Sequence, residues 1–286
     1  MPTDTASMIQ TRRMSFEQSL QDVPRHFGPD GDLISSHIVA CLSAVFPDGE
    51  DFFVRSVRRF RGDVTEPVLK RQVGGFIGQE AVHGREHRAF NRRLSDVGYP
   101  TRFLERFTER LLAIADRVLP AKACLAVTAA LEHYTATLAE QLLRDEETRA
   151  LMGHQKVREL FLWHALEESE HKTVAFDVYR TVGGTERMRR VVMNAITVGF
   201  IGGVGLAVAL SLLGDRATYN PRRLAVSLRR LWRSPIVSRE LWRELRSYNE
   251  LEFHPSDRDA TELLETWREE LFGADGALND RMAGVA

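Results

Sequence analysis

The feature that most constrains how this chain can fold is a short pattern of chemistry-bearing residues that occurs twice. The pattern runs in the order Glu50, Glu80-x-x-His83, Glu132 and Glu168-x-x-His171. Residues three apart on a helix share one face, so each Glu-x-x-His pair can hold one metal ion. The intervals of 30 residues from Glu50 to Glu80 and 36 from Glu132 to Glu168 suit antiparallel neighbouring helices. The pattern therefore predicts four helices that direct carboxylates and imidazoles into one interior.

The rest of the chain also shows apolar residues at helical spacing and almost no strand-like alternation. We therefore predict an all-α fold, a four-helix bundle with additional C-terminal helices. The expected parts are a polar N-terminal lead (1–30), a di-metal helical bundle (31–185), and an apolar helix with a C-terminal extension packed on the bundle (186–286). The expected helices cover 32–44, 50–60, 67–94, 101–118, 120–143, 157–182, 191–213 and 257–271, with Pro47-Asp48-Gly49 interrupting the first two.

The net charge and the cysteine content limit which partners and which metal ligands this chain can have. The formal charge is -1, and no nucleic-acid motif is evident, so we expect no nucleic-acid partner. Cys41 and Cys124 stand far apart, and residues 1–21 lack the apolar core of a secretory signal. A cytoplasmic setting is the default expectation. A metal site must then rest on histidine and carboxylate.

A third histidine extends the second Glu-x-x-His pair. Steps of four and three residues place His164, Glu168 and His171 on one stripe of a helix, whereas Glu167 lies about a hundred degrees away and is the weaker candidate. Glu132 stands among alanines and leucine, where an unpaired carboxylate would be costly to bury. A metal would compensate that charge.

Some residues near the pattern have simpler explanations. If Glu50 begins a helix, the helix dipole alone accounts for its carboxylate, but we keep it as a ligand. His87, one turn beyond His83, is a candidate for an additional ligand, a partner behind the ligands, or polar surface. His133 points away from Glu132 and is interpreted as structural or as a partner behind the ligands. Asp177 is equally a ligand-orienting or a surface residue, and His26, His37, His154 and His254 have no evident partners.

Residues 191–213 form a 23-residue run without a charge, which is long enough to span a bilayer. Gly199-x-x-x-Gly203 would allow close helix contact within a membrane. A helix buried against the bundle or lying in a membrane interface would have a similar sequence. The run therefore leaves three alternatives open: a membrane helix, a membrane-surface helix and a buried helix.

The chain resembles the bacterial family catalogued as predicted metal-dependent hydrolases, over roughly residues 30 to 265. The segments that carry the resemblance are Phe46-Pro47-Asp48-Gly49-Glu50-Asp51-Phe52-Phe53, Gln79-Glu80-Ala-Val-His83, Leu131-Glu132-His133-Tyr134, Trp163-His164 through His171, and Phe253-His254-Pro255. The ligand pattern is ferritin-like and is similar to that of p-aminobenzoate N-oxygenase-type di-iron enzymes, in which an extra histidine precedes the second Glu-x-x-His by four residues. That resemblance implies a di-iron oxygenase with His164 as the extra ligand.

The leading functional hypothesis is an oxygenase that uses O2 to oxidise a small organic substrate. Two iron ions, or manganese, would be held by Glu50, Glu80, His83, Glu132, His164, Glu168 and His171. Phe53, Phe76 and Phe161 are the expected pocket wall, and electrons would come from an external donor. The alternatives are hydrolysis by a water that bridges two metals and a non-catalytic metal-binding or membrane-associated protein. A homodimer is left open.

Overall fold

The computed structural model describes residues 9–283, and in this range the regular secondary structure is helical, with no strand and with a single isolated bridge between Met14 and Met282. The all-α prediction is confirmed. The helices are α1 (Leu33–Arg58), α2 (Pro67–Asp96), α3 (Thr101–Val118), α4 (Ala121–Arg144), α5 (Glu146–Ala150), α6 (Gln155–His171), α7 (Val174–Thr181), α8 (Glu186–Leu213), α9 (Pro221–Arg233), α10 (Arg239–Ser247) and α11 (Thr261–Phe272).

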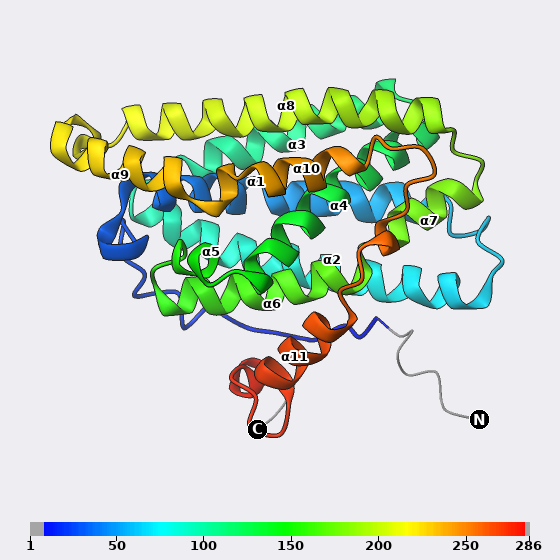
Figure 1. Ribbon diagram of the computed structural model, residues 1–286, viewed down its shortest axis with the longest axis horizontal. Helices are drawn as coiled ribbons and strands as arrows, with labels where there is room; N and C mark the ends of the chain where they lie inside the picture. The colour runs from blue at the N-terminus through cyan, green and yellow to red at the C-terminus, as the bar shows by residue number, and fades with distance from the viewer. Residues whose placement is uncertain (1–8, 284–286) are drawn as a thin grey trace.

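Four of these helices form the central bundle. Helix α1 packs along α2, α4 packs along α6, and α1 also contacts α4 (Figure 1). Helices α3 and α8 lie outside this bundle, where both pack on α1 and α8 also packs on α4. Each helix of the bundle carries one element of the doubled pattern, so the fold brings all four elements to the same interior.

Helix α1 is continuous, which corrects the predicted interruption at 47–49. Pro47 lies inside the helix, where it lacks the N–H that would bond to the carbonyl of Ser43. The side-chain Nδ2 of Asn91 donates to that carbonyl at 3.0 Å instead. A contact from α2 therefore offsets the cost of the proline. Glu50 consequently lies in the middle of α1, where a helix-dipole explanation of its carboxylate does not apply.

The helix predicted over 157–182 is two helices, because α6 ends at His171 and α7 begins at Val174. No glycine or proline stands at the break. Lys172 turns inward there, and its Nζ donates to Glu140 Oε1 at 2.7 Å and to the carbonyl oxygen of Arg258 at 2.7 Å. These contacts with distant parts of the chain decide where the helix ends, so the local sequence does not reveal it.

The N-terminal segment, predicted to be a polar lead, contributes apolar side chains to the protein core. Across its described part, five apolar side chains join the main hydrophobic core: Met14, Phe16, Leu20, Val23 and Phe27. The segment runs along the bundle toward the C-terminal end of the chain, where Met14 pairs with Met282. One consequence is that Arg12 reaches the carboxylates of α6.

Candidate metal centre

All seven predicted ligands lie together inside the central bundle. Glu50 comes from α1, Glu80 and His83 from α2, Glu132 from α4, and His164, Glu168 and His171 from α6. Each is at most 4% exposed to solvent. The sequence prediction that these helices direct their polar side chains toward one point therefore describes the observed placement. Ligation itself stays a prediction.

The donor atoms fall into three overlapping groups, and within each group they lie within 4.8 Å of one another. These groups are Glu50–His83–His164, Glu80–His83–Glu168 and Glu80–Glu132–His171. Because Glu80 and His83 each belong to two groups, the groups form one connected cluster.

Individual distances show how the cluster is connected. Glu168 Oε1 lies 3.0 Å from His164 Nε2, 3.5 Å from His83 Nδ1 and 3.6 Å from His171 Nε2. His171 Nε2 lies 3.1 Å from Glu80 Oε1 and 3.4 Å from Glu132 Oε2. Glu168 thus stands between the two ends of the cluster, where a bridging carboxylate would lie.

Many polar atoms of this cluster have no hydrogen-bond partner among the described residues. They are both carboxylate oxygens of Glu50, Glu80 and Glu132, one oxygen of Glu168, His83 Nδ1 and His171 Nε2. Buried polar atoms are almost always satisfied, and an unpaired buried carboxylate is costly. Four glutamates that converge with unpaired oxygens therefore fit cations as their missing partners.

Each imidazole of the cluster turns one nitrogen inward and binds a fixed partner with the other. His83 Nε2 lies 3.0 Å from Glu167 Oε2, and His171 Nδ1 lies 2.9 Å from Gln79 Oε1. His164 Nδ1 lies 2.6 Å from His87 Nε2. Partners of this kind orient metal-binding histidines and fix their tautomers. This arrangement is what a metal site requires of its surroundings.

His87 lies behind His164 and outside the three groups. Its Nδ1 lies 2.9 Å from Ser43 Oγ, and that hydroxyl also donates to Asn91 Oδ1 at 2.7 Å. Both ring nitrogens of His87 are therefore engaged. Of the three alternatives for this residue, the geometry matches a partner behind the ligands.

Glu167 and Arg12 are the residues near the cluster that sequence reasoning undervalued. Glu167 is fully buried, and Arg12 Nη1 donates to its Oε1 at 3.0 Å. Arg12 also bonds Glu170 through Nη1 and Nη2 at 2.9 and 2.8 Å. The separation of 155 residues between Arg12 and Glu167 leaves no local signal of this contact. Two adjacent glutamates on a helix that carries ligands were the available hint.

The charges of the cluster act strongly on one another. Burial, with Glu80 adding to it, raises the pKa of Glu50 well above its usual range, and burial raises the pKa of Glu132 to about 8 although His171 opposes that rise. Burial opposes the charging of His83, but the hydrogen bond to Glu167 and the nearby carboxylates of Glu168 and Glu80 outweigh it and raise its pKa to about 10. Without cations, the carboxylates therefore compete for protons, a competition that bound cations would relieve.

Glu168 behaves differently from the other carboxylates. Burial tends to raise the pKa of Glu168, yet the charge of His171, the hydrogen bond from His164 and the nearby His83 ring hold it well below its usual range. The same contacts raise the pKa of His171 well above its usual range, against the effect of burial. Burial and the charge of His83 lower the pKa of His164 to about 4. Glu168 is therefore the carboxylate that stays charged at the centre of the cluster.

Aromatic rings surround the imidazoles. Phe76 lies 4.9 Å from the ring of His171, and Phe161 lies 5.3 Å from that of His87, as centroid distances. Trp163 and Phe46 cover His83 and His164 at 4.9 and 5.1 Å. Phe53 is buried in the adjoining apolar cluster with Phe76. These rings keep bulk water from the imidazoles and place the cluster in a low-dielectric setting.

The remaining histidines lie outside the cluster. His133 Nε2 donates to the Glu244 carbonyl at 3.1 Å, which fits the structural role predicted for it. His254 lies 2.8 Å from Asp177, so Asp177 does not orient a ligand. His26 and His37 both contact Asp215, so these two histidines and His254 were wrongly interpreted as lacking partners.

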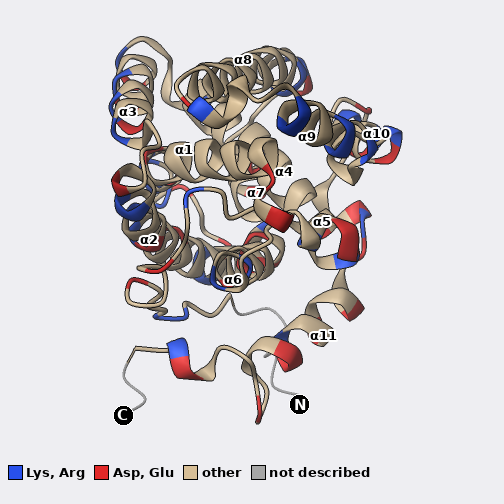
Figure 2. Cartoon of the chain, turned by 90° about the vertical axis from the view of Figure 1, so that its left-hand side faces the viewer, with Lys and Arg blue, Asp and Glu red and all other residues tan. Residues whose placement is uncertain are grey.

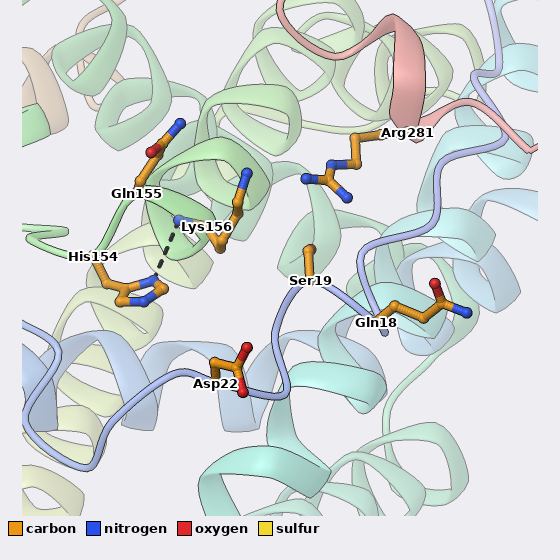
Figure 3. Close-up of a pocket in the computed structure, with 7 residues that line it drawn as sticks. All are labelled: Gln18, Ser19, Asp22, His154, Gln155, Lys156 and Arg281. Atoms are coloured by element: carbon orange, nitrogen blue, oxygen red, sulfur yellow. Dashed lines mark hydrogen bonds between the residues drawn. The ribbon is translucent and has the colours of Figure 1, made fainter.

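The surface hollow drawn in Figure 3 is separate from this cluster. It has a volume of about 490 Å³ and is lined by Gln18, Ser19, Asp22, His154, Gln155, Lys156 and Arg281. His154 precedes α6, so it stands about 15 Å along the helix from His164. None of the seven predicted ligands lines the hollow.

Comparison with known proteins gave one result that bears on the site. A family model described as "Predicted metal-dependent hydrolase" matches residues 10–259. This range contains all seven predicted ligands. No curated protein and no solved structure matched the chain.

Proposed function

Because the chain belongs to the family of predicted metal-dependent hydrolases, we propose that it is a hydrolytic enzyme with a dinuclear metal centre. The proposal of a metal centre is supported by the unpaired buried carboxylate oxygens of Glu50, Glu80, Glu132 and Glu168. Two divalent cations would balance four carboxylate charges, which in this setting otherwise cost several kcal/mol each.

The proposed ligands divide into two ends joined by bridges. Glu50, His83 and His164 would hold one cation, Glu132 and His171 would hold the other, and Glu80 and Glu168 lie between the two ends. The end with Glu132 and His171 has fewer protein donors. We assign the exchangeable position to that end, as catalytic sites keep a position open for water or substrate.

Two bound divalent cations would lower the pKa of a water molecule and polarise the bond to be cleaved. Gln79 holds the ring of His171 at 2.9 Å, so Nε2 stays directed at Glu80 and Glu132. Phe76 packs against the same ring and excludes bulk water from that end. Glu167 and Arg12 fix His83 at the other end.

Oxidation by O2, with an external electron donor and a small organic substrate, is the second candidate. The observation that favours it is the donor set, since four carboxylates and three imidazoles without a thiolate suit iron or manganese. The deep burial of the cluster also favours a small co-substrate such as O2 over direct access by a bulky one.

The two candidates are separated by measuring both activities on one preparation. The protein, loaded anaerobically with Fe(II) or Mn(II), is assayed against a panel of esters, amides and phosphoesters, and then for O2 consumption with a reductant. We expect metal-dependent hydrolysis that does not require O2 and is lost in Glu132→Ala. The matched control His254→Ala removes a histidine outside the cluster and keeps full activity. Stoichiometric O2 consumption without hydrolysis would replace the proposal with the second candidate.

A further inference from the structure

The outer face formed by α3, α8 and α9 is unusually apolar for a protein surface. Residues 191–213 of α8 carry no charge, yet this part of the helix is not covered by the rest of the protein. Only 6% of its most apolar 18-residue window is buried. Large apolar side chains exposed on α8 include Val191, Val198, Ile201, Leu206, Leu210 and Leu213. Contiguous apolar surface of this kind marks an interaction site.

Helix α3 adds a second apolar stripe to this face. Phe103, Phe107, Leu111, Ile114 and Val118 recur every three or four residues, and each is more than half exposed. Helices α3 and α8 both pack on α1, and Leu104 of α3 shares a small apolar cluster with Ala207 and Val208 of α8 (Figure 1). The exposed apolar side chains of the two helices therefore belong to one part of the surface.

Basic residues adjoin this apolar face. Residues 186–233 contain nine arginines and two acidic residues, in a chain whose formal charge is only -1. Helix α9 alone has five arginines and no acidic residue (Figure 2). Two large aromatic side chains stand beside these arginines, Trp232 at 79% exposure and Tyr219 at 69%. Apolar surface next to arginines and exposed tryptophan is the composition of a protein surface that binds at a membrane interface.

We propose that the α3–α8–α9 face docks on an anionic lipid bilayer, with the apolar side chains in the headgroup boundary and the three exposed α9 arginines, Arg222, Arg229 and Arg233, on lipid phosphates. The other two, Arg223 and Arg230, bond to the segment that precedes α1. Charge complementarity favours this occupant over a second copy of the chain. A second copy offers the same arginine-rich segment, whereas anionic lipid offers opposite charge.

Helix α8 is held on the bundle at several points, which favours docking over spanning. Near its start, the buried Arg189 donates to the carbonyl of Glu250, which lies outside α8, at 2.7 Å. In its middle, Tyr134 donates to Thr197 at 2.7 Å.

At its end, His37 Nδ1 lies 2.7 Å from Ser211 Oγ, while Asp215 pairs with Arg25, His26 and His37. Crossing a bilayer would require breaking these contacts. The cluster of His26, His37 and Asp215 thus serves to hold α8 in place.

The direct test is co-sedimentation of the purified full-length protein with vesicles of phosphatidylcholine alone or with 30% phosphatidylglycerol, roughly the anionic share that makes surface charge matter. We expect binding to the anionic vesicles that weakens as salt rises. Changing Val198→Asp with Leu206→Asp should weaken binding about tenfold or more, because both side chains leave the bilayer boundary. The matched control, Thr261→Asp with Thr266→Asp, places the same two charges on α11 and should bind as wild type.

Two further variants test the parts of the face separately. Phe107→Asp with Ile114→Asp tests α3 independently of whether α8 tolerates charge. Replacing Arg222, Arg229 and Arg233 with glutamine should weaken binding about fivefold per arginine. Replacing Arg58, Arg61 and Arg71 with glutamine is the control for total charge and should have a much smaller effect.

Three results would overturn the proposal. The first is wild-type protein that stays in the supernatant with anionic vesicles. The second is protein that remains in membranes after carbonate extraction, which would establish a spanning helix. The third is a dimer in sedimentation velocity that the Val198→Asp and Leu206→Asp changes split into monomers without any vesicle binding, which would assign the face to a second copy of the chain.

Discussion

The inside of the bundle and its α3–α8–α9 face reverse the usual distribution of residues. The interior holds carboxylates and imidazoles at most 4% exposed, whereas Val198 and Phe103 on the outer face are 76% and 64% exposed. Each reversal costs free energy in a simple soluble protein, through unpaired buried charge inside and exposed apolar area outside. Such costs mark the places where a chain interacts with something else. The interior points to cations, and the outer face points to a bilayer.

The largest effect on stability is expected at the buried ion pairs between Arg12 and two glutamates of α6. Replacing Arg12 with alanine leaves Glu167 and Glu170 buried without that partner and should lower the free energy of unfolding by about 3–5 kcal/mol. Urea unfolding measures the change. Arg13→Ala removes the neighbouring exposed arginine and should change stability by less than about 0.5 kcal/mol. Equal effects of the two substitutions would contradict the role given to Arg12.

Apolar side chains of one type should differ between the two regions. Leu166 is fully buried and Leu206 is 61% exposed. Leu166→Ala should destabilise the protein by about 2–5 kcal/mol through lost burial and a cavity. Leu206→Ala should cost less than about 0.5 kcal/mol in solution. A large cost at Leu206 without lipid would mean that the α8 face is covered by protein.

His133 offers a test that depends on pH. Burial, with Arg258 adding to it, lowers its pKa to about 3, so the folded protein keeps it neutral while the unfolded chain protonates below about 6.5. Protonation therefore favours unfolding, and stability falls as pH falls from 6.5 toward 3. Between pH 7 and pH 5 this group should contribute a loss of about 2 kcal/mol.

Comparison with His133→Gln isolates that contribution, because every other titrating group is common to both proteins. Urea unfolding at the two pH values should show a smaller acid-induced loss in the variant. Identical losses would show that His133 accepts a proton in the folded state.

An effect of similar size, on metal affinity and not on stability, is expected at the partners that hold the imidazoles. Gln79→Leu removes the hydrogen bond to His171 Nδ1, and metal affinity should fall about 10- to 100-fold, as for other partners of metal-binding histidines. Competition with a chelator of known affinity measures this. Gln155→Leu, on the exposed start of α6, is the matched control.

The features that could be predicted from the sequence are those set by residue spacing within a single helix. Helical spacing placed His164, Glu168 and His171 on one stripe, and the same reasoning predicted Thr101–Val118 with the bounds of α3. The prediction works because one helix face is determined by neighbours along the chain.

Features that depend on distant contacts were not predictable in this way. Pro47 stays inside α1 because Asn91 binds the carbonyl that it frees, and α6 ends after His171 because Lys172 reaches Glu140. Arg12 meets Glu167 only through the path of the N-terminal segment. None of these contacts has a periodic signature, so propensity and pattern cannot reveal them.

The central claim is that the buried cluster holds two cations, and metal content measures it most directly. Protein purified under non-chelating conditions, or reconstituted anaerobically with Fe(II) or Mn(II), is analysed by elemental mass spectrometry. We predict about two metal ions per chain in the wild type and in His254→Ala, and a large loss of metal in Glu132→Ala and His171→Ala. A folded wild-type protein that binds no metal, or unchanged metal content in both cluster variants, would contradict the account.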